Sequence, residues 1–276
     1  MKQQVNYVES SRVIGGERMA YRYVGTISPR SVVFIHGLGG CAGSWEWIQD
    51  YLYGKGISSV AVDLLGFGLS TRPKNHAAYR LENQAKKVEN LLQKIGVNQP
   101  ILIGHCMGGM VAQIMVLDKQ PMTKLILMCT VNRMPDYFRI LNTGHLMAQT
   151  MGTLGNTLPD THLPGRRDYR PFAHRGDYSL PQKYCDIRYS SLKSYCHSFS
   201  WAMELDVVGR SKEIGVPTYI IGGTKDTMFF PKTLRKLYRD IPGSKLSWIQ
   251  GGNHVMPLGK YREVAEQLRK IIMGEA

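Results

Sequence analysis

The sequence predicts an α/β protein built on a mostly parallel sheet, and three features of the chain carry this prediction. Short apolar runs alternate with amphipathic segments of helical spacing along most of the 276 residues. The apolar runs are continuous, as expected for strands that helices cover on both faces. Several runs end in glycine-rich turns, where a strand can pass directly into a helix. Such an alternation is typical of a sheet wound by right-handed crossovers.

The expected elements follow one another in a regular order. Two edge strands come first, and the second alternates apolar and polar residues. Ser44 is predicted to cap a helix, and Gly96 is predicted to end another one. The predicted strands are 5–8, 19–24, 31–35, 58–62, 101–103, 124–129, 216–222 and 245–249. The predicted helices are 45–53, 79–96, one from residue 106 to about 119, 190–205, 231–239 and one from about 261 to 271.

The stretch from residue 101 to 109, ILIGHCMGG, is the most informative part of the chain. Its apolar run ends in G-x-C-x-G and leads straight into a buried helix. The glycines permit a strained turn and a close approach of strand and helix, which leaves Cys106 at the tip. The free amides and the positive dipole end of that helix favour a thiolate. The pattern therefore indicates a nucleophile.

This stretch resembles the G-x-S-x-G nucleophile elbow of the α/β-hydrolase fold, with Cys106 in place of the usual serine. The H-G-x-G sequence at 36–39, directly after a predicted strand, resembles the loop that supplies an oxyanion amide in that family. The resemblance implies an α/β-hydrolase fold with a mostly parallel eight-stranded sheet flanked by helices. It also implies an oxyanion hole formed by the N–H groups of Leu38 and Met107.

Two further residues complete a candidate catalytic triad. Asp226 comes four residues after the next-to-last predicted strand, and His254 comes five residues after the last one. The carboxyl ends of parallel strands open on one edge of a sheet, so the thiol, carboxylate and imidazole are expected to meet there. Their order along the chain is that of the family. Asp136 is a second candidate for the acid.

The strand alternation breaks between residues 133 and 212, a segment with many Met and Tyr and a basic tract at 166–175. An insertion here resembles the cap of many α/β-hydrolases. We therefore expect a core formed by 1–132 and 213–276 and a cap formed by 133–212. Trp201 in the cap and His105 beside the nucleophile are candidate substrate-binding residues.

The composition indicates which classes of partner and cofactor to expect. The chain has 35 Lys and Arg against 21 Asp and Glu, a net charge of +14 that favours acidic partners. No nucleic-acid-binding motif accompanies the charge, so we expect no nucleic acid. The five cysteines and eight histidines are scattered without a disulfide or metal-ligand spacing, so we expect neither a metal ion nor another cofactor. The sequence has no apolar stretch long enough for a membrane span and no signal-peptide core, which predicts a cytoplasmic protein.

Cysteine as the nucleophile favours acyl transfer over simple hydrolysis. Exchange of one thioester for another is nearly thermoneutral, so an acyl group on Cys106 stays activated for a second acceptor. In this respect the chain is similar to the Cys-dependent aminoacyl and acyl transferases that act on carrier proteins. We expect an acyl substrate, presented on coenzyme A or on an acidic acyl or peptidyl carrier protein. A hydrolase of an ester, thioester, lactone or carbon–carbon bond, a non-catalytic binding protein of this fold and an engineered Ser-to-Cys variant remain open alternatives.

Overall fold

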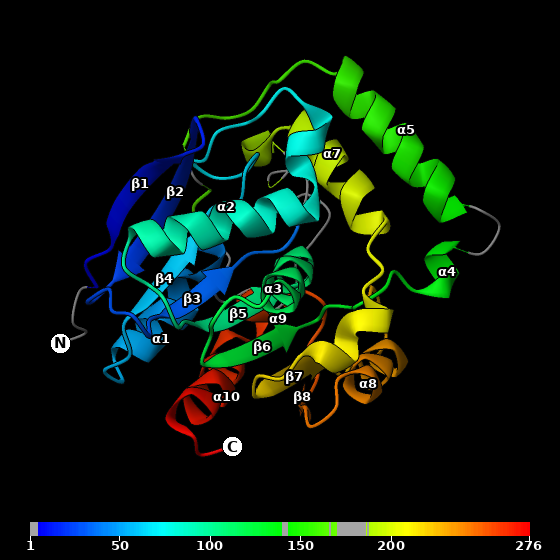
Figure 1. Cartoon of the computed structure of the whole chain (residues 1–276). Coiled ribbons are helices and arrows are strands. Elements are labelled where there is room, and N and C mark those ends of the chain that lie inside the picture. Colours follow the sequence, from blue (N-terminus) through cyan, green and yellow to red (C-terminus); the bar gives the residue numbers. More distant parts are fainter. Residues whose placement is uncertain (1–4, 140–142, 166, 170–185, 187) are drawn as a thin grey trace.

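The computed structural model describes residues 5–139, 143–165, 167–169, 186 and 188–276. Eight strands form one sheet in the order β1-β2-β4-β3-β5-β6-β7-β8 (Figure 1). The pairs β1–β2 and β2–β4 are antiparallel, and the strands from β4 to β8 run parallel. The mostly parallel eight-stranded sheet predicted from the sequence is therefore confirmed. The strands are β1 (Val8–Ile14), β2 (Glu17–Val24), β3 (Val32–Ile35), β4 (Ser59–Val62), β5 (Ile101–His105), β6 (Lys124–Met128), β7 (Thr218–Gly223) and β8 (Lys245–Ile249).

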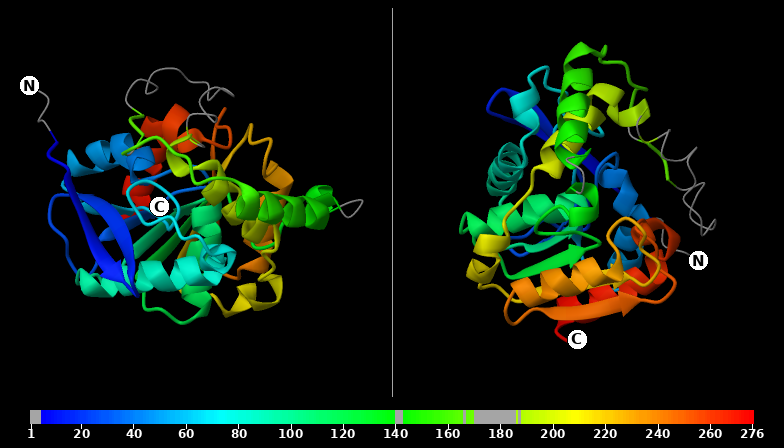
Figure 2. Two further views of the ribbon diagram at one scale, coloured as in Figure 1. Left: turned by 90° about the horizontal axis from the view of Figure 1, so that it is seen from above. Right: turned by 90° about the vertical axis from the view of Figure 1, so that its right-hand side faces the viewer.

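Helices cover both faces of this sheet, and each face has its own apolar cluster (Figures 1 and 2). Side chains of α1 and α10 pack on one face, and those of α2, α3 and α8 pack on the other. Residues 101–104 of the central strand β5 and the first six residues of α3 are all apolar or glycine, which is why both can be buried between the two layers. The helices of the core are α1 (Glu46–Tyr53), α2 (Leu81–Lys94), α3 (Met107–Leu117), α8 (Pro231–Asp240), α9 (Met256–Gly259) and α10 (Tyr261–Met273), with short 3-10 turns η1 (Ala42–Trp45) and η2 (His76–Tyr79).

Two local expectations were wrong. The first strand runs over Val8–Ile14 rather than 5–8, because Gly15 and Gly16, both with positive φ, close a hairpin onto β2. Ser44 does not cap the helix that follows β3. It lies inside the turn η1, where its hydroxyl accepts a hydrogen bond from the N–H of Cys41, and Trp45 is the residue before α1.

Between β6 and β7, the described residues form helices joined by loops and contribute no strand to the sheet. It includes α4 (Asp136–Arg139), α5 (Thr143–Thr157), α7 (Leu192–Met203) and the turn η5 (Val208–Glu213). Figure 1 shows α5 and α7 side by side above the edge of the sheet at which the parallel strands end. We call residues 133–212 the cap segment. Among the described residues, no helix combines the length and apolar character that crossing a bilayer requires.

Candidate active site

The turn from β5 to α3 has the strained geometry that its glycines predict. Cys106 has φ 52° and ψ −119°, a conformation that side chains other than glycine rarely adopt. A Cβ on Gly104 would lie 2.4 Å from the carbonyl oxygen of Gly108, and one on Gly108 would lie 2.3 Å from that of Ile35. Only glycine fits at these two positions, since strand and helix backbones nearly touch. The turn thus presents Cys106 at the carboxyl edge of the sheet.

The loop after β3 passes directly against this nucleophile. A Cβ on Gly37 would lie 3.0 Å from the Cβ of Cys106, so the backbone of the loop passes close to the side chains of the elbow. Within the described residues, the N–H groups of Leu38 and Met107 have no hydrogen-bond acceptor. Both amides are therefore unpaired within the described residues, which is one requirement of an oxyanion hole.

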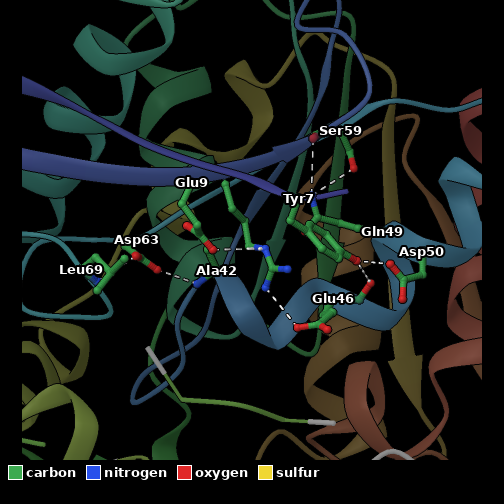
Figure 3. A network of polar contacts seen from close by, with 10 residues as sticks. Tyr7, Glu9, Ala42, Glu46, Gln49, Asp50, Ser59, Asp63 and Leu69 are labelled. Atoms are coloured by element: carbon green, nitrogen blue, oxygen red, sulfur yellow. Dashed lines mark hydrogen bonds and ion pairs between the residues drawn. The ribbon is translucent and has the colours of Figure 1, made fainter. Parts of the chain in front are cut away.

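Buried polar groups hold the oxyanion loop in place. His36 is fully buried, with Nδ1 2.8 Å from the carbonyl oxygen of Gly37 and Nε2 accepting the N–H of Leu64 at 3.1 Å. The Asp63 carboxylate accepts the N–H groups of Ala42 and Leu69 at 2.6 and 2.9 Å, and Figure 3 shows it between these residues. The glycine-rich stretch that follows β4 therefore has a structural role.

Asp226 and His254 meet at the carboxyl edge of the sheet. Asp226 follows β7 and is 2 % exposed, and its Oδ2 lies 3.0 Å from Nδ1 of His254 in the loop after β8. Its Oδ1 accepts the N–H groups of Met228 and Phe229, each at 2.9 Å. Burial alone would raise the pKa of Asp226, but the hydrogen bond and charge of His254 hold that pKa below its usual value. The carboxylate is thus kept charged and fixed in orientation.

The imidazole of His254 stands between this carboxylate and Cys106. Burial opposes its charge, yet the electrostatic interaction with Cys106 and the hydrogen bond to Asp226 raise the pKa of His254 to about 10. Its Nε2 is buried and makes no hydrogen bond of ordinary geometry. Catalytic contacts are often long before substrate binds. The arrangement favours a protonated imidazole at His254 beside the side chain of Cys106.

Cys129 is a neighbour of the pair that the sequence pattern did not single out. It follows β6, has a positive φ of 42° and is fully buried. One side-chain atom from each of Cys129, Asp226 and His254 lies within 4.8 Å of the others. Burial and the charge of Asp226 raise the pKa of Cys129, and its thiol interacts with that carboxylate. Metal ligation needs a thiolate, so these donors fit a hydrogen-bonded thiol better than a metal site.

His105 supports the loop that carries His254. Its Nε2 lies 2.8 Å from the carbonyl oxygen of His254, and its ring stands edge-on to Trp45 at 6.4 Å. Burial, with the nearby charge of His254, lowers the pKa of His105 to about 3, so the ring is neutral and donates this hydrogen bond. These contacts give His105 a positioning role, and its binding of substrate stays a prediction.

The cap segment brings Tyr195 of α7, rather than Trp201, to the oxyanion loop. A Cβ on Gly39 would lie 3.3 Å from the Tyr195 ring, and burial together with the charge of Cys106 raises the pKa of Tyr195 to about 12. Trp201 stacks on His76 at 4.9 Å and donates its indole N–H to the carbonyl oxygen of that residue. The two aromatic residues are six positions apart, about 240° around a helix, so they lie on different faces. Contact of Trp201 with substrate stays a prediction.

Two further predictions from the sequence concern Asp136 and the basic tract at 166–175. Asp136, the second candidate acid, begins α4 and is exposed, in contrast to the buried and hydrogen-bonded Asp226. Of the predicted basic tract 166–175, residues 166 and 170–175 lie outside the described residues.

Comparison with known proteins agrees with the fold. Residues 30–162 match the family model described as alpha/beta hydrolase fold. Lipase 1 of Psychrobacter immobilis is 24 % identical over 271 residues, which cover 95 % of this chain and 83 % of the lipase. A proline iminopeptidase of Lactobacillus delbrueckii subsp. bulgaricus is 25 % identical over 279 residues, covering 88 % of this chain and 91 % of that enzyme. The thioesterase domain from the curacin biosynthetic pathway superimposes with a TM-score of 0.76 and 19 % identity, over 98 % of this chain and 99 % of the domain.

Proposed function

This chain has the α/β-hydrolase fold, and we propose that it is an acyl-transfer enzyme that carries its acyl group on Cys106 as a thioester. The observation that carries the proposal is the position of a cysteine at the strained elbow, beside an imidazole whose pKa is raised to about 10. A raised pKa means that His254 holds a proton readily at neutral pH, which favours a thiolate nucleophile.

In the first half of the reaction, the sulfur of Cys106 attacks the carbonyl carbon of an acyl donor. The negative charge that develops on the carbonyl oxygen is received by the N–H groups of Leu38 and Met107, one such donor being worth about 3–4 kcal/mol. The bond to the leaving thiol then breaks, and His254 delivers a proton to that thiol. Asp226 stabilises the imidazolium and fixes its tautomer throughout.

In the second half, an acceptor thiol, amine or hydroxyl loses its proton to His254 and attacks the thioester on Cys106. The same two amides receive the oxyanion, and Cys106 leaves as a thiolate that the protonated His254 stabilises. Exchange between two thioesters is nearly thermoneutral, so the acyl group remains activated on the enzyme. This is the chemical reason for preferring transfer when the nucleophile is cysteine.

We propose thioesters of coenzyme A or of an acidic acyl or peptidyl carrier protein as the donors. The net charge of +14 supports an acidic donor, because opposite charge steers association.

Hydrolysis is the second candidate function, and the relatives favour it. Their names include a lipase and a thioesterase domain, whose chemistry shares the acyl-enzyme step with transfer. The two functions differ only in whether water or another nucleophile discharges Cys106.

The first experiment is intact-protein mass spectrometry after mixing the protein with acyl and aminoacyl thioesters of coenzyme A and of carrier proteins. We expect an acyl adduct on the wild type and none on Cys106→Ala. Discharge of the adduct by a second carrier thiol, with slow discharge by water, supports the transferase. Rapid release of free acid favours the hydrolase. No adduct from any donor contradicts both and leaves a binding protein of this fold.

A further inference from the structure

One helix of the core carries a charge pattern that the candidate active site does not use. Four exposed cations on α8 are spaced at i, i+3, i+4 and i+7, which places them within about 100° of one another around the helix. The buried Leu234 and Leu237 hold the opposite side of α8 against the sheet. We call the four cations the basic face, and they are Lys232, Arg235, Lys236 and Arg239.

These cations are not neutralised within the protein. Among the described residues, no Asp or Glu forms an ion pair with any residue of the basic face. Asp240, the acid of the same helix, accepts a hydrogen bond from Asn132 at 3.0 Å. The C-terminal helix α10 differs, because Arg269 forms ion pairs with Glu266 and Glu275. The basic face therefore retains its charge for a partner.

The position of α8 connects this face with the candidate active site. Asp226 lies in the loop between β7 and α8, and Met228 and Phe229 of the same loop bond to its carboxylate. The helix begins at Pro231, so its first turn is close to the edge of the sheet where Cys106 lies. In the right-hand view of Figure 2, α8 (orange) lies on the outside of the molecule, on the side turned to the viewer. Phe230, 39 % exposed, adds an apolar contact point at this end.

We propose that the basic face of α8 is the docking surface for an acidic carrier protein that delivers the acyl thioester to Cys106. The inference rests on the proposed function, which supplies the thioester, while the charge and exposure of the face supply the partner's chemistry. An acidic protein surface lying along α8 pairs with several cations at once, and its flexible thioester arm enters past the loop of Asp226. Complementary charge of this kind raises the association rate and selects the partner.

The test compares one acyl group on two donors, an acidic acyl carrier protein and the small thiol N-acetylcysteamine. The variant is Lys232→Glu with Lys236→Glu. Arg235 is left unchanged because its guanidinium lies over the ring of Trp248, 5.3 Å from the ring centroid. Arg239 is left unchanged because it lies at the C-terminal end of the helix. We expect kcat/KM for acylation by the carrier to fall about tenfold or more, mainly through KM. Acylation by the small thioester should change less than about twofold.

The matched control is Lys55→Glu with Lys270→Glu, which makes the same change in net charge on the opposite face of the sheet. Both lysines are exposed and lie beside or on α1 and α10. The control should acylate from both donors like the wild type. The wild-type preference for the carrier should also shrink between about 50 and 500 mM NaCl, because salt screens exposed charges.

Several outcomes overturn the docking proposal alone. The first is an unchanged kcat/KM for the carrier in the α8 variant. The second is a loss of kcat/KM for the carrier that is equally large in the Lys55→Glu, Lys270→Glu control. The third is a loss in the α8 variant that is equally large for the small thioester. Binding of duplex DNA or of anionic vesicles that depends on Lys232 and Lys236, with carrier binding unaffected, would assign the face to another partner. If neither donor acylates Cys106, the proposed function fails instead. Direct titration of the carrier against the wild type and the α8 variant then decides the docking separately.

Discussion

The core and the cap segment hold the two sides of the candidate active site in different ways. On the core side, backbone groups fix the reacting residues: the Asp226 carboxylate accepts two main-chain N–H groups, and the elbow admits only glycine two residues before and two residues after Cys106. On the cap side, α7 is held largely by side chains, including the pair His76–His197 with the two Nδ1 atoms 2.7 Å apart. Tyr195 reaches the oxyanion loop from this helix.

This difference indicates that the core side serves the chemical step and the cap side serves the choice of substrate. Positions set by a sheet edge and by backbone hydrogen bonds vary little, which suits groups that must meet a reacting carbonyl within a fraction of an ångström. Positions set by side chains of a cap change with a single substitution, which suits the choice of substrate. Changes on the core side should therefore alter the rate of chemistry, and changes on the cap side should alter binding and stability.

The largest effect is expected on the core side, for His254→Ala. Without the imidazole, no group accepts or returns the proton of the thiol, and we expect acylation to slow by about 10²- to 10⁴-fold. Stopped-flow or quenched-flow mass spectrometry of the Cys106 adduct measures this rate. A near-normal rate would show that another group is the base.

Asp226→Asn should have a smaller effect. The change removes the negative charge facing the imidazolium but leaves a side chain of the same shape. A hydrogen bond to a charged group is worth about 1.5–3 kcal/mol, so we expect a loss of about 10- to 150-fold in kcat/KM. The exposed Asp136 gives the matched control, since Asp136→Asn should be active. The reverse result would assign the acid role to Asp136.

On the cap side, Tyr195→Ala should raise the KM for acyl donors by about tenfold, the effect of roughly 1.4 kcal/mol, with little change in kcat. The paired variant is Trp201→Ala, which removes the stacking on His76 and should lower the melting temperature while leaving KM within about threefold. Steady-state kinetics and thermal unfolding of both variants test this contrast. A larger KM effect from Trp201 would place that residue in the substrate pocket instead.

Cys129→Ala should slow acylation by about fivefold, because the Asp226 carboxylate loses a neighbouring donor worth about 1 kcal/mol. Cys129→Ser keeps a donor at this position and should be closer to the wild type. Loss of the thiol removes a group that stabilises the charged carboxylate, so the pKa of Asp226 should rise in the Ala variant. The acidic limb of the pH profile of kcat/KM should therefore move to higher pH in that variant alone. If the limb is the same in all three proteins, Cys129 is only a packing residue.

The smallest effect concerns the pH dependence of stability at the cap. Burial, and then the charge of His76, lowers the pKa of His197 to about 4, whereas an unfolded histidine titrates near pH 6.5. The unfolded chain therefore binds more protons between these values, and this residue makes stability fall as the pH drops from about 6.5 to 4. His197→Leu should flatten that fall in urea unfolding at pH 7 and 5. If the free energy of unfolding falls equally between pH 7 and 5 in the variant and in the wild type, the lowered pKa of His197 is contradicted.

The sequence by itself determined the succession of strands and helices along the chain and the main parts of the candidate site. Continuous apolar runs, the glycines around Cys106 and the spacing of Asp226 and His254 after their strands are local signals, and each follows from backbone sterics or burial. They predicted the parallel sheet and three residues at its carboxyl edge, of which the structure joins Asp226 and His254 by a hydrogen bond.

Only the tertiary structure decided which other side chains reach these residues. Cys129 follows β6, the strand between β5 and β7, and its nearness to Asp226 depends on strand order and on a positive φ that no local pattern indicated. The choice of Tyr195 over Trp201 at the oxyanion loop depends on how α7 is rotated, and side-chain pairs far apart in sequence fix that rotation. Long-range packing decides such contacts, because a helix carries several apolar side chains and only docking selects the face that is used.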